Sequence, residues 1–292
     1  MAKLLLGKEV TASIYEDLAA RSAALLERGI TPTLAVIRIG ENPGDLSYER
    51  GAEKNALRAG VRLEKYVLPP LCSKQSLLEL LDRLNGADSV HGVLLFRPLP
   101  PHLQADQCEI CNQLDPRKDV DSMTHLSNAG VYEGCARLGF APCTAQACME
   151  VLHHYGIDCR GKSVAVLGRS LVIGKPVAML LAAEDATVTL CHSRTPNVSE
   201  ICRRSDLIVT CCGKRDSLTA EAVRPGQVIL DVSINWDPEK PNAKGTLGAV
   251  TGDCRFAEVE PIVEAITPVP GGIGAVTTAV LFKHLVEAAE SR

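Results

Sequence analysis

The stretch KSVAVLGRSLVIGKPVA, residues 162–178, decides the fold because it joins an apolar run, a glycine-containing loop and the start of a helix. Gly168 directly follows the apolar run, and Gly174 opens the helix. A helix start presents unpaired N–H groups and the positive end of the helix dipole, which suits a phosphate. The spacing departs from GxGxxG because Ser170 takes the second glycine position, so a plain strand-to-helix turn remains an alternative.

Apolar runs and helix-like segments alternate on both sides of this stretch. On its C-terminal side, strands are predicted at 187–193, 206–213 and 227–234, and helices at 174–186 and 197–205. On its N-terminal side, strands are predicted at 31–40, 61–69 and 90–101, and helices at 47–60, 73–86 and 144–156. This alternation is typical of α/β proteins with parallel sheets, and it favours a doubly wound nucleotide-binding sheet around residues 162–178.

Two further segments complete the expected organisation of the chain. The turn-rich segment 236–248 is predicted to be an exposed excursion between strands. The segment 277–291 is predicted to be a long amphipathic helix that returns to the first domain.

The end of the strand predicted at 187–193 bears on the cofactor. NAD sites usually carry a carboxylate there, about 20 residues after the glycine loop, to bind the ribose 2′-hydroxyl. Ser193 and Arg194 stand there instead, and Arg169 could add a second positive charge. These donors suit a 2′-phosphate, so NADP is favoured and NAD stays possible. The alternative is that Arg194 is only a solvated surface charge, and His192 is interpreted as structural.

Composition narrows the function classes. The 292 residues are enough for two domains, and 46% hydrophobic residues with only 3% aromatic ones predict aliphatic cores. A net charge of −4 without a basic stripe argues against nucleic acid as a partner. No apolar run reaches the roughly 18 residues of a membrane span, so a cytoplasmic protein is expected. The twelve cysteines include one CxxC pair, at 108–111, without a second pair, so we expect structural cysteines and no metal site.

Several longer blocks carry a resemblance. They are GENPGDLSY (40–48), KDVDS (118–122), APCTAQA (141–147), VLGRSLVIGKP (166–176), TVTLCHSRT (187–195) and ITPVPGGIGAVTTAVL (266–281). Together and in this order they resemble the methylenetetrahydrofolate dehydrogenase/methenyltetrahydrofolate cyclohydrolase family, the FolD type, over nearly the whole chain. The resemblance implies a folate and catalytic domain made of residues 1–142 and 269–292. It also implies a Rossmann-like NAD(P) domain at 143–268, a cleft between the two, a homodimer and no metal for hydride transfer.

The resemblance also assigns residues to the site. Tyr48 matches the tyrosine that stacks on the folate, and Asp121 matches the carboxylate that hydrogen-bonds the pterin; both are expected in the catalytic site. A carboxylate can accept two N–H bonds from an aminopyrimidine edge. The expected folate-pocket loop contains Pro268, Gly271 and Gly272, and the expected cofactor residues are Gly168, Arg169, Ser170, Gly174, Ser193 and Arg194.

The sequence departs from the family pattern at its catalytic lysine. That lysine stands four residues after the tyrosine, on the same helix face, and here the position is Ala52. Lys54 is six residues after Tyr48, so a helix turns it about 120° away. The strand that usually reads VQLPLP reads LFRPLP, so Phe96 replaces the glutamine that hydrogen-bonds the lysine. Asp45 and Ser122 replace a serine and a glycine of the pattern.

These departures predict which activity survives. Hydride transfer to nicotinamide abstracts no proton and depends mainly on positioning. Cyclohydrolysis moves protons, for which a lysine near neutral pKa is suited. We therefore expect an NADP-preferring methylenetetrahydrofolate dehydrogenase with weak or absent cyclohydrolase activity. The alternatives are a conventional bifunctional enzyme that moves protons through Asp45 or a water, a dehydrogenase for an altered one-carbon carrier, and a non-catalytic folate- or nucleotide-binding protein.

Overall fold

The computed structural model describes residues 1–134, 138–241 and 246–291 and divides the chain into two compact units. The six-strand unit contains residues 1–11 and 144–277, and the three-strand unit contains residues 12–143 and 278–292. The functional boundaries expected at 142/143 and 268/269 stay a prediction, because these units are defined by their internal contacts alone.

The six-strand unit is built on a parallel sheet with the strand order β1-β11-β8-β7-β5-β6. Its strands are β1 (Lys3–Leu4), β5 (Ser163–Leu167), β6 (Thr187–Cys191), β7 (Leu207–Thr210), β8 (Val228–Asp231) and β11 (Ala265–Ile266). Its helices are α6 (Cys143–His154), α7 (Gly174–Ala183), α8 (Val198–Arg204) and α9 (Phe256–Val259), with a 3-10 turn η4 (Ala220–Ala222). The predicted α/β class and doubly wound sheet are confirmed.

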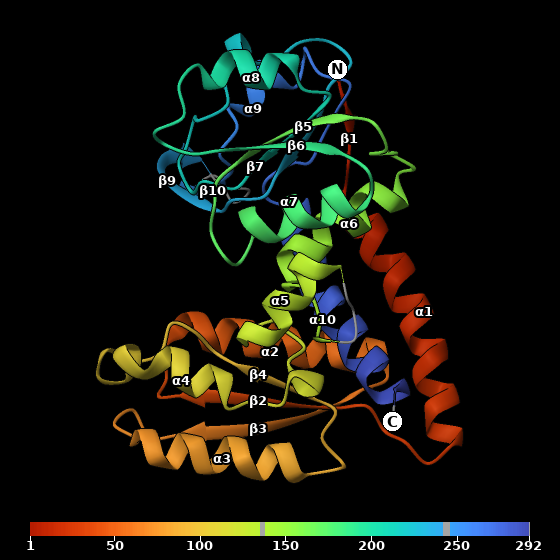
Figure 1. Cartoon of the computed structure of the whole chain (residues 1–292), viewed down its shortest axis with the longest axis vertical. Coiled ribbons are helices and arrows are strands. Elements are labelled where there is room, and N and C mark those ends of the chain that lie inside the picture. The colour runs from red at the N-terminus through yellow and green to blue at the C-terminus, as the bar shows by residue number, and fades with distance from the viewer. Residues whose placement is uncertain (135–137, 242–245, 292) are drawn as a thin grey trace. The chain divides into compact units, whose positions relative to one another are not determined.

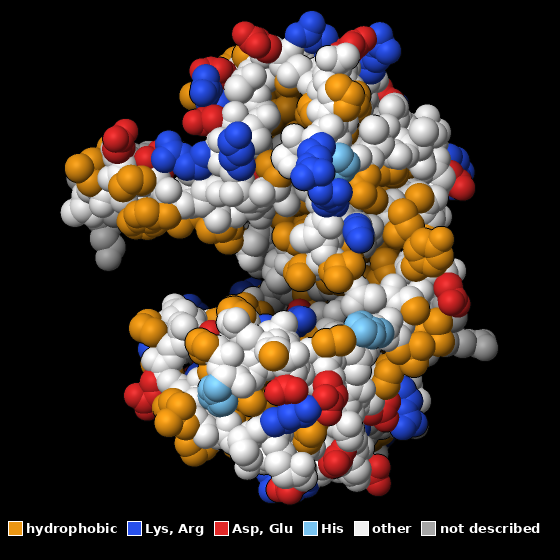
Figure 2. Space-filling view, turned by 60° about the vertical axis from the view of Figure 1, so that its left-hand side comes forward, with side chains coloured by type: hydrophobic (Ala, Val, Ile, Leu, Met, Phe, Trp, Pro, Cys, Tyr) orange, Lys and Arg blue, Asp and Glu red, His pale blue; other side chains and the backbone are white. Residues whose placement is uncertain are grey.

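One expectation about this unit, the turn-rich exposed excursion at 236–248, is only partly right, and residues 242–245 of that segment lie outside the described residues. The segment expected to be a turn-rich excursion contains two antiparallel strands, β9 (Asn235–Pro241) and β10 (Leu247–Thr251). A two-strand ribbon has only edge strands, so it tolerates prolines that a central strand would exclude. The side chains of Ile234, Trp236 and Leu247 are mostly exposed there, and hydrophobic side chains gather along this hairpin in Figure 2.

The three-strand unit is built on a parallel sheet with the order β3-β2-β4 (Figure 1). Its strands are β2 (Thr33–Ile39), β3 (Arg62–Leu68) and β4 (Gly92–Leu95). Its helices are α2 (Pro43–Ala59), α3 (Lys74–Gly86), α4 (Gln107–Asn112) and α5 (His125–Glu133), with 3-10 turns η1 (Pro101–Asp106) and η2 (Pro116–Lys118). Two long helices, α1 (Gly7–Glu27) and α10 (Ile273–Glu290), have most of their residues in this unit.

The two faces of the three-strand sheet bury different side chains. Successive residues of a strand point to opposite faces. Ala35, Ile37 and Ile39 of β2 pack into an aliphatic core with the leucines of α3, including Leu77 and Leu81. The other face of the sheet is left for α2.

A buried ion pair attaches α2 to this other face. Arg38 Nε lies 3.0 Å from Glu49 Oε2, and Lys65 Nζ lies 3.1 Å from Glu49 Oε1. Burial alone would raise the pKa of Glu49, but hydrogen bonds from Arg38 and Lys65 hold it below its ordinary value. Losing one partner of a buried pair leaves an uncompensated charge, so this contact fixes which face of α2 meets the sheet.

No helix within the described ranges is both long and apolar enough to cross a membrane.

A buried carboxyl group stands at the end of β8 in the six-strand unit. Asp231 Oδ1 accepts hydrogen bonds from Thr210 Oγ1 at 3.0 Å and from the backbone N–H of Asp253 at 2.9 Å. Its Oδ2 accepts one from the N–H of Cys254 at 3.0 Å. Burial nevertheless raises the pKa of Asp231 to about 6, because desolvation outweighs these three bonds.

This raised pKa gives a test of the fold. A carboxyl group whose pKa is higher in the folded state stabilises the fold below the ordinary pKa of 3.8, and this contribution is lost as the pH rises through about 6. The stability of the wild type relative to Asp231→Asn should therefore fall by roughly 2–3 kcal/mol over that window. Urea unfolding of both proteins at about pH 4 and about pH 7 measures the difference. A difference that does not change with pH contradicts this account of Asp231.

Candidate functional site

Two aromatic side chains mark the candidate folate site in the three-strand unit. Tyr48 extends from α2, and Phe96 directly follows β4. Their rings meet edge to face, with centroids 5.6 Å apart and planes at 84°. Tyr48 remains 38% exposed, so part of its ring is free to stack on a flat ligand. Burial raises the pKa of its hydroxyl above the ordinary value, and a hydrogen bond with Thr278 opposes this only in part.

The carboxylate of Asp121 lies beside a guanidinium. Arg97 Nη2 is 2.9 Å from Asp121 Oδ2, and both side chains are partly exposed. Burial raises the pKa of Asp121, while Arg97 lowers it and a hydrogen bond from the Cys143 thiol lowers it further. Tyr48 lies close enough for Asp121 to raise the pKa of its hydroxyl, so the two residues assigned by resemblance share one site.

Ala52 is buried where the family pattern has its lysine. It is 1% exposed and lies on the stripe of α2 that also contains Glu49, Ala56 and Ala59. Lys54 is exposed, which agrees with the expected difference in direction along the helix.

Two other departures from the pattern have unusual surroundings. Ser122 adopts a left-handed backbone with φ of 53°, and its buried hydroxyl has no hydrogen-bond partner among the described residues. An unsatisfied buried hydroxyl costs about 1–3 kcal/mol, so this position has a structural cost that a glycine would avoid. Asp45 lies in the first turn of α2, where burial raises its pKa and Arg38 opposes the shift.

The glycines of the predicted cofactor loop are required by close packing in the six-strand unit. Gly168 has φ of 133°, and a Cβ there would lie 2.5 Å from the carbonyl oxygen of Cys211. A Cβ on Gly174 would lie 2.3 Å from the carbonyl oxygen of Gly168. The start of α7 is therefore pressed against the end of β5, which leaves its N-terminus close to the loop. Ser170 accepts hydrogen bonds through Oγ from the N–H groups of Ile173 at 3.1 Å and Gly174 at 3.4 Å.

The loops after β5 and β6 leave the sheet at the same edge. β5 pairs with β6 in register, and the N–H of Gly168 donates to the carbonyl of Cys191 at 3.0 Å. The side chains of Arg169, Ser193 and Arg194 are exposed. Neither arginine forms an ion pair with another described residue. The chain order reverses between β5 and β7, and open α/β sheets bind ligands outside the carboxyl ends of strands at such a point.

The loop expected in the folate pocket borders a small cavity of the six-strand unit. Pro268, Gly271 and Gly272 line a cavity of about 240 Å³ together with Val232 and apolar residues of the hairpin segment. Gly271 has φ of 104°, and its carbonyl accepts a hydrogen bond from the N–H of Gly7 at 2.8 Å. The loop is thus held by the start of α1.

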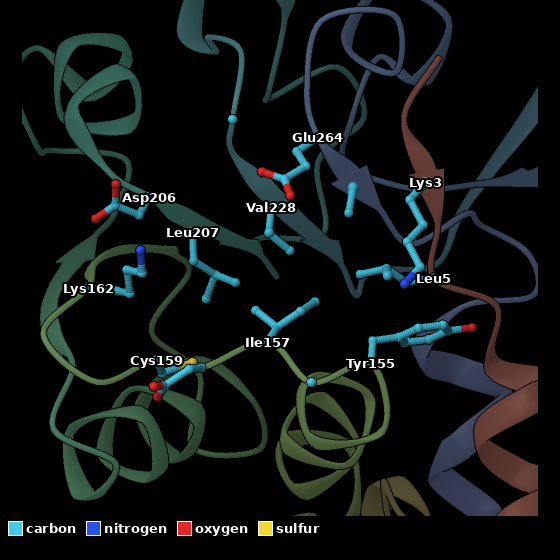
Figure 3. A pocket seen from close by; sticks show the side chains of 14 residues that line it. Lys3, Leu5, Tyr155, Ile157, Cys159, Lys162, Asp206, Leu207, Val228 and Glu264 are labelled. Atoms are coloured by element: carbon cyan, nitrogen blue, oxygen red, sulfur yellow. The ribbon is translucent and has the colours of Figure 1, made fainter.

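A larger cavity of about 460 Å³ lies where the strands of the same sheet begin, at the end opposite the cofactor loop (Figure 3). It is lined by residues at or just before the amino ends of the strands, namely Lys3, Lys162, Leu207 and Val228. Dinucleotide sites of this fold lie at the carboxyl ends, so this cavity is separate from the predicted cofactor loop.

The structure therefore places the expected residues in two groups. Tyr48, Ala52, Phe96 and Asp121 belong to the three-strand unit. The folate-pocket loop and all six cofactor residues belong to the six-strand unit. Sequence reasoning missed Arg97, although the arginine of LFRPLP was a visible signal. Within the described residues no group of three His, Cys, Asp or Glu side chains could hold a metal ion.

Comparison with known proteins identifies relatives along the whole chain. Residues 5–121 match the catalytic-domain model of tetrahydrofolate dehydrogenase/cyclohydrolase, and residues 142–292 match the NAD(P)-binding-domain model of the same family. The bifunctional protein FolD of Carboxydothermus hydrogenoformans is 45% identical over 290 residues, which cover 99% of this chain and 98% of that protein.

Solved structures agree with this result. The FolD dehydrogenase/cyclohydrolase of Campylobacter jejuni superposes with a TM-score of 0.92 at 34% identity, covering 100% of both chains. The Trypanosoma brucei enzyme, complexed with NADP and an inhibitor, gives 0.90 at 32% identity, covering 99% of this chain and 98% of that one. The chain belongs to the tetrahydrofolate dehydrogenase/cyclohydrolase family.

Proposed function

We propose that this protein transfers a hydride from 5,10-methylenetetrahydrofolate to NADP and that its cyclohydrolase activity is weak or absent. The observation that carries the second part is Ala52, a buried methyl group one helical turn from Tyr48. The first part is supported by family membership and by the exposed ring of Tyr48 beside Asp121.

The hydride step needs little from the residues that have changed. The methylene carbon gives a hydride to nicotinamide C4, and the resulting cation is delocalised over two nitrogens. No proton is abstracted, so the protein contributes mainly by holding the two reactants in line. Tyr48 would stack on the folate and Asp121 would hold its pterin edge, and neither role involves the residue at position 52.

The hydrolytic step needs a group that exchanges protons. Water adds to the methenyl carbon and the ring then opens, so protons have to be moved. The phenol of Tyr48 and the thiol of Cys143 both have pKa values raised by burial, which makes them poor bases at neutral pH. The guanidinium of Arg97 stays protonated. Phe96 adds an apolar ring where the family pattern has an amide.

A conventional bifunctional enzyme is the second candidate, and the relatives favour it because several of them are named bifunctional. Asp45 and Asp121 are the carboxyl groups that could then move the proton, since burial raises the pKa of both. A dehydrogenase for an altered carrier is a third candidate, supported by the buried, unpartnered hydroxyl of Ser122.

The side chains that follow β5 and β6 support the preference for NADP. Ser193 and Arg194 follow β6, and Arg169 follows β5. Neither arginine forms an ion pair within the described part of the chain. A 2′-phosphate carries negative charge that such donors bind well. The relative from Trypanosoma brucei was solved with NADP.

A homodimer is proposed on the resemblance and on the exposed hairpin. Ile234, Trp236 and Leu247 are 67%, 63% and 72% exposed, and large exposed apolar groups of this kind often mark protein contacts. A cytoplasmic location remains a prediction from the sequence.

The weak-cyclohydrolase proposal can be tested by introducing a lysine at position 52. We expect Ala52→Lys combined with Phe96→Gln to increase hydrolysis of methenyltetrahydrofolate by about 10²–10⁴-fold, because a general acid–base group is restored beside Tyr48. Loss of methenyl absorbance measures the rate.

Ala56→Lys is the matched control, because Ala56 is also buried, at 3% exposure, one turn further along α2. It should give no gain. Wild-type protein that already hydrolyses as fast as the double variant would contradict the weak-cyclohydrolase proposal.

The cofactor preference can be tested at Arg194. Arg194→Gln should weaken NADP binding by about 10–100-fold, the value of one charge-assisted hydrogen bond, and leave NAD binding nearly unchanged. Calorimetric titration with both cofactors measures this. Arg204→Gln is the control, since Arg204 is an exposed arginine of α8 that pairs with Glu200. Equal losses for NADP and NAD would rule out a contact with the 2′-phosphate.

The proposed dimer can be tested at Trp236. The wild type should have the mass of two chains in light scattering, and Trp236→Glu should shift it toward one chain because a charge would be buried in the contact. A wild-type mass of one chain at micromolar concentration refutes the dimer.

A further inference from the structure

Arg97 and Asp121 form an ion pair in the candidate folate site. Arg97 Nη2 lies 2.9 Å from Asp121 Oδ2, with 25% and 30% of the two side chains exposed. Partly exposed pairs of this kind contribute about 0–1 kcal/mol. The pair also remains accessible to a ligand, because neither side chain is closed off. Its position next to Phe96 and Tyr48 therefore suggests a role in the site.

Arg97 is the cation that lowers the pKa of Asp121. The other groups facing this carboxyl are Asp119, the thiol of Cys143 and the hydroxyl of Tyr48. Asp119 repels a second negative charge, and the thiol and the phenol are neutral at neutral pH. Burial also disfavours the charged form. Without Arg97, the pKa of Asp121 would therefore be raised further.

The carboxyl group of Asp119 accepts three hydrogen bonds from residues other than Asp121. Its Oδ1 accepts from the N–H of Met123 at 2.8 Å, and its Oδ2 accepts from the N–H of Thr124 at 2.8 Å and from Ser127 Oγ at 2.7 Å. Asp119 raises the pKa of Asp121, and Arg97 opposes this effect.

The contact leaves Asp121 able to bind a ligand. A carboxylate has about four acceptor positions on its two oxygens, and the hydrogen bonds from Arg97 and Cys143 use two of them. Two N–H groups of an aminopyrimidine edge can still be accepted. The planar guanidinium also restricts how the carboxylate rotates, which a flexible ammonium group would do less well.

We propose that Arg97 is a positioning residue of the folate site, which keeps the Asp121 carboxylate charged and oriented for the pterin. The inference rests on the proposed function, because the pterin is assigned to Asp121 by resemblance. Arg97 supplies a charge but no proton exchange, since a guanidinium does not lose its proton in proteins. It can therefore support folate binding without restoring cyclohydrolysis.

The test is the pH dependence of tetrahydrofolate binding, measured by calorimetry between about pH 5.5 and about pH 8.5. Wild-type affinity should change little over this range. Arg97→Leu should bind about tenfold more weakly near pH 6 and approach the wild type near pH 8.5, because its Asp121 takes up a proton at low pH. Arg97→Lys keeps the charge and should restore most of the affinity at pH 6.

Controls separate this proposal from a structural role. Arg117→Leu removes another arginine–aspartate pair, the more exposed one with Asp115, and should bind like the wild type. If Arg97→Leu does not fold, as judged by its unfolding midpoint, Arg97→Gln takes its place. An equal loss of affinity at every pH, or no loss, would overturn the role of Arg97 while leaving the proposed function intact. A wild type that binds no tetrahydrofolate at any pH would overturn the proposed function and the inference with it.

Discussion

The buried ion pair between Arg38 and Glu49 is the contact on which the candidate site depends. It fixes α2 on the three-strand sheet through a charge that cannot be left unpaired at low cost. Because Glu49 follows Tyr48 directly, the rotation of α2 is fixed where the site needs it. In the proposed function, the residue at position 52 on the same stripe determines whether hydrolysis is supported. At position 52 a lysine would have brought a titratable amine near Tyr48, and an alanine brings only a methyl group.

This arrangement separates two properties that one lysine would combine, a positive charge and an exchangeable proton. Hydride transfer and folate binding need position and charge, whereas ring opening needs a proton to move. We propose that in this chain Arg97, two residues after β4, supplies the charge beside Asp121. A guanidinium cannot act as a base at neutral pH. On the proposed function, the chain retains groups for binding and positioning and lacks the lysine suited to acid–base work.

Much of the fold could be predicted from the sequence because the signals were local. Apolar runs ending in glycine identified β5 and its loop, and the glycine at 174 is explained by a backbone contact that a side chain would block.

Other features depend on contacts between distant segments. β1 has two residues and forms because β11, 262 residues later (Lys3 pairs with Ala265), offers it a parallel partner. The strands β9 and β10 were not predicted, because the prolines of WDPEKP are compatible with an edge strand as well as with a loop. Arg97 precedes a proline and reads as a surface charge, until the fold brings Asp121 to it.

The central claim concerns the fate of the methenyl product, and one progress curve tests it most directly. Purified wild-type protein is mixed with methylenetetrahydrofolate and NADP, and reduced cofactor and methenyltetrahydrofolate are followed together. The account predicts that both rise in step and that the methenyl species then decays no faster than it does without protein. Reduction of NADP without accumulation of the methenyl species would contradict it, because hydrolysis would then survive without the lysine.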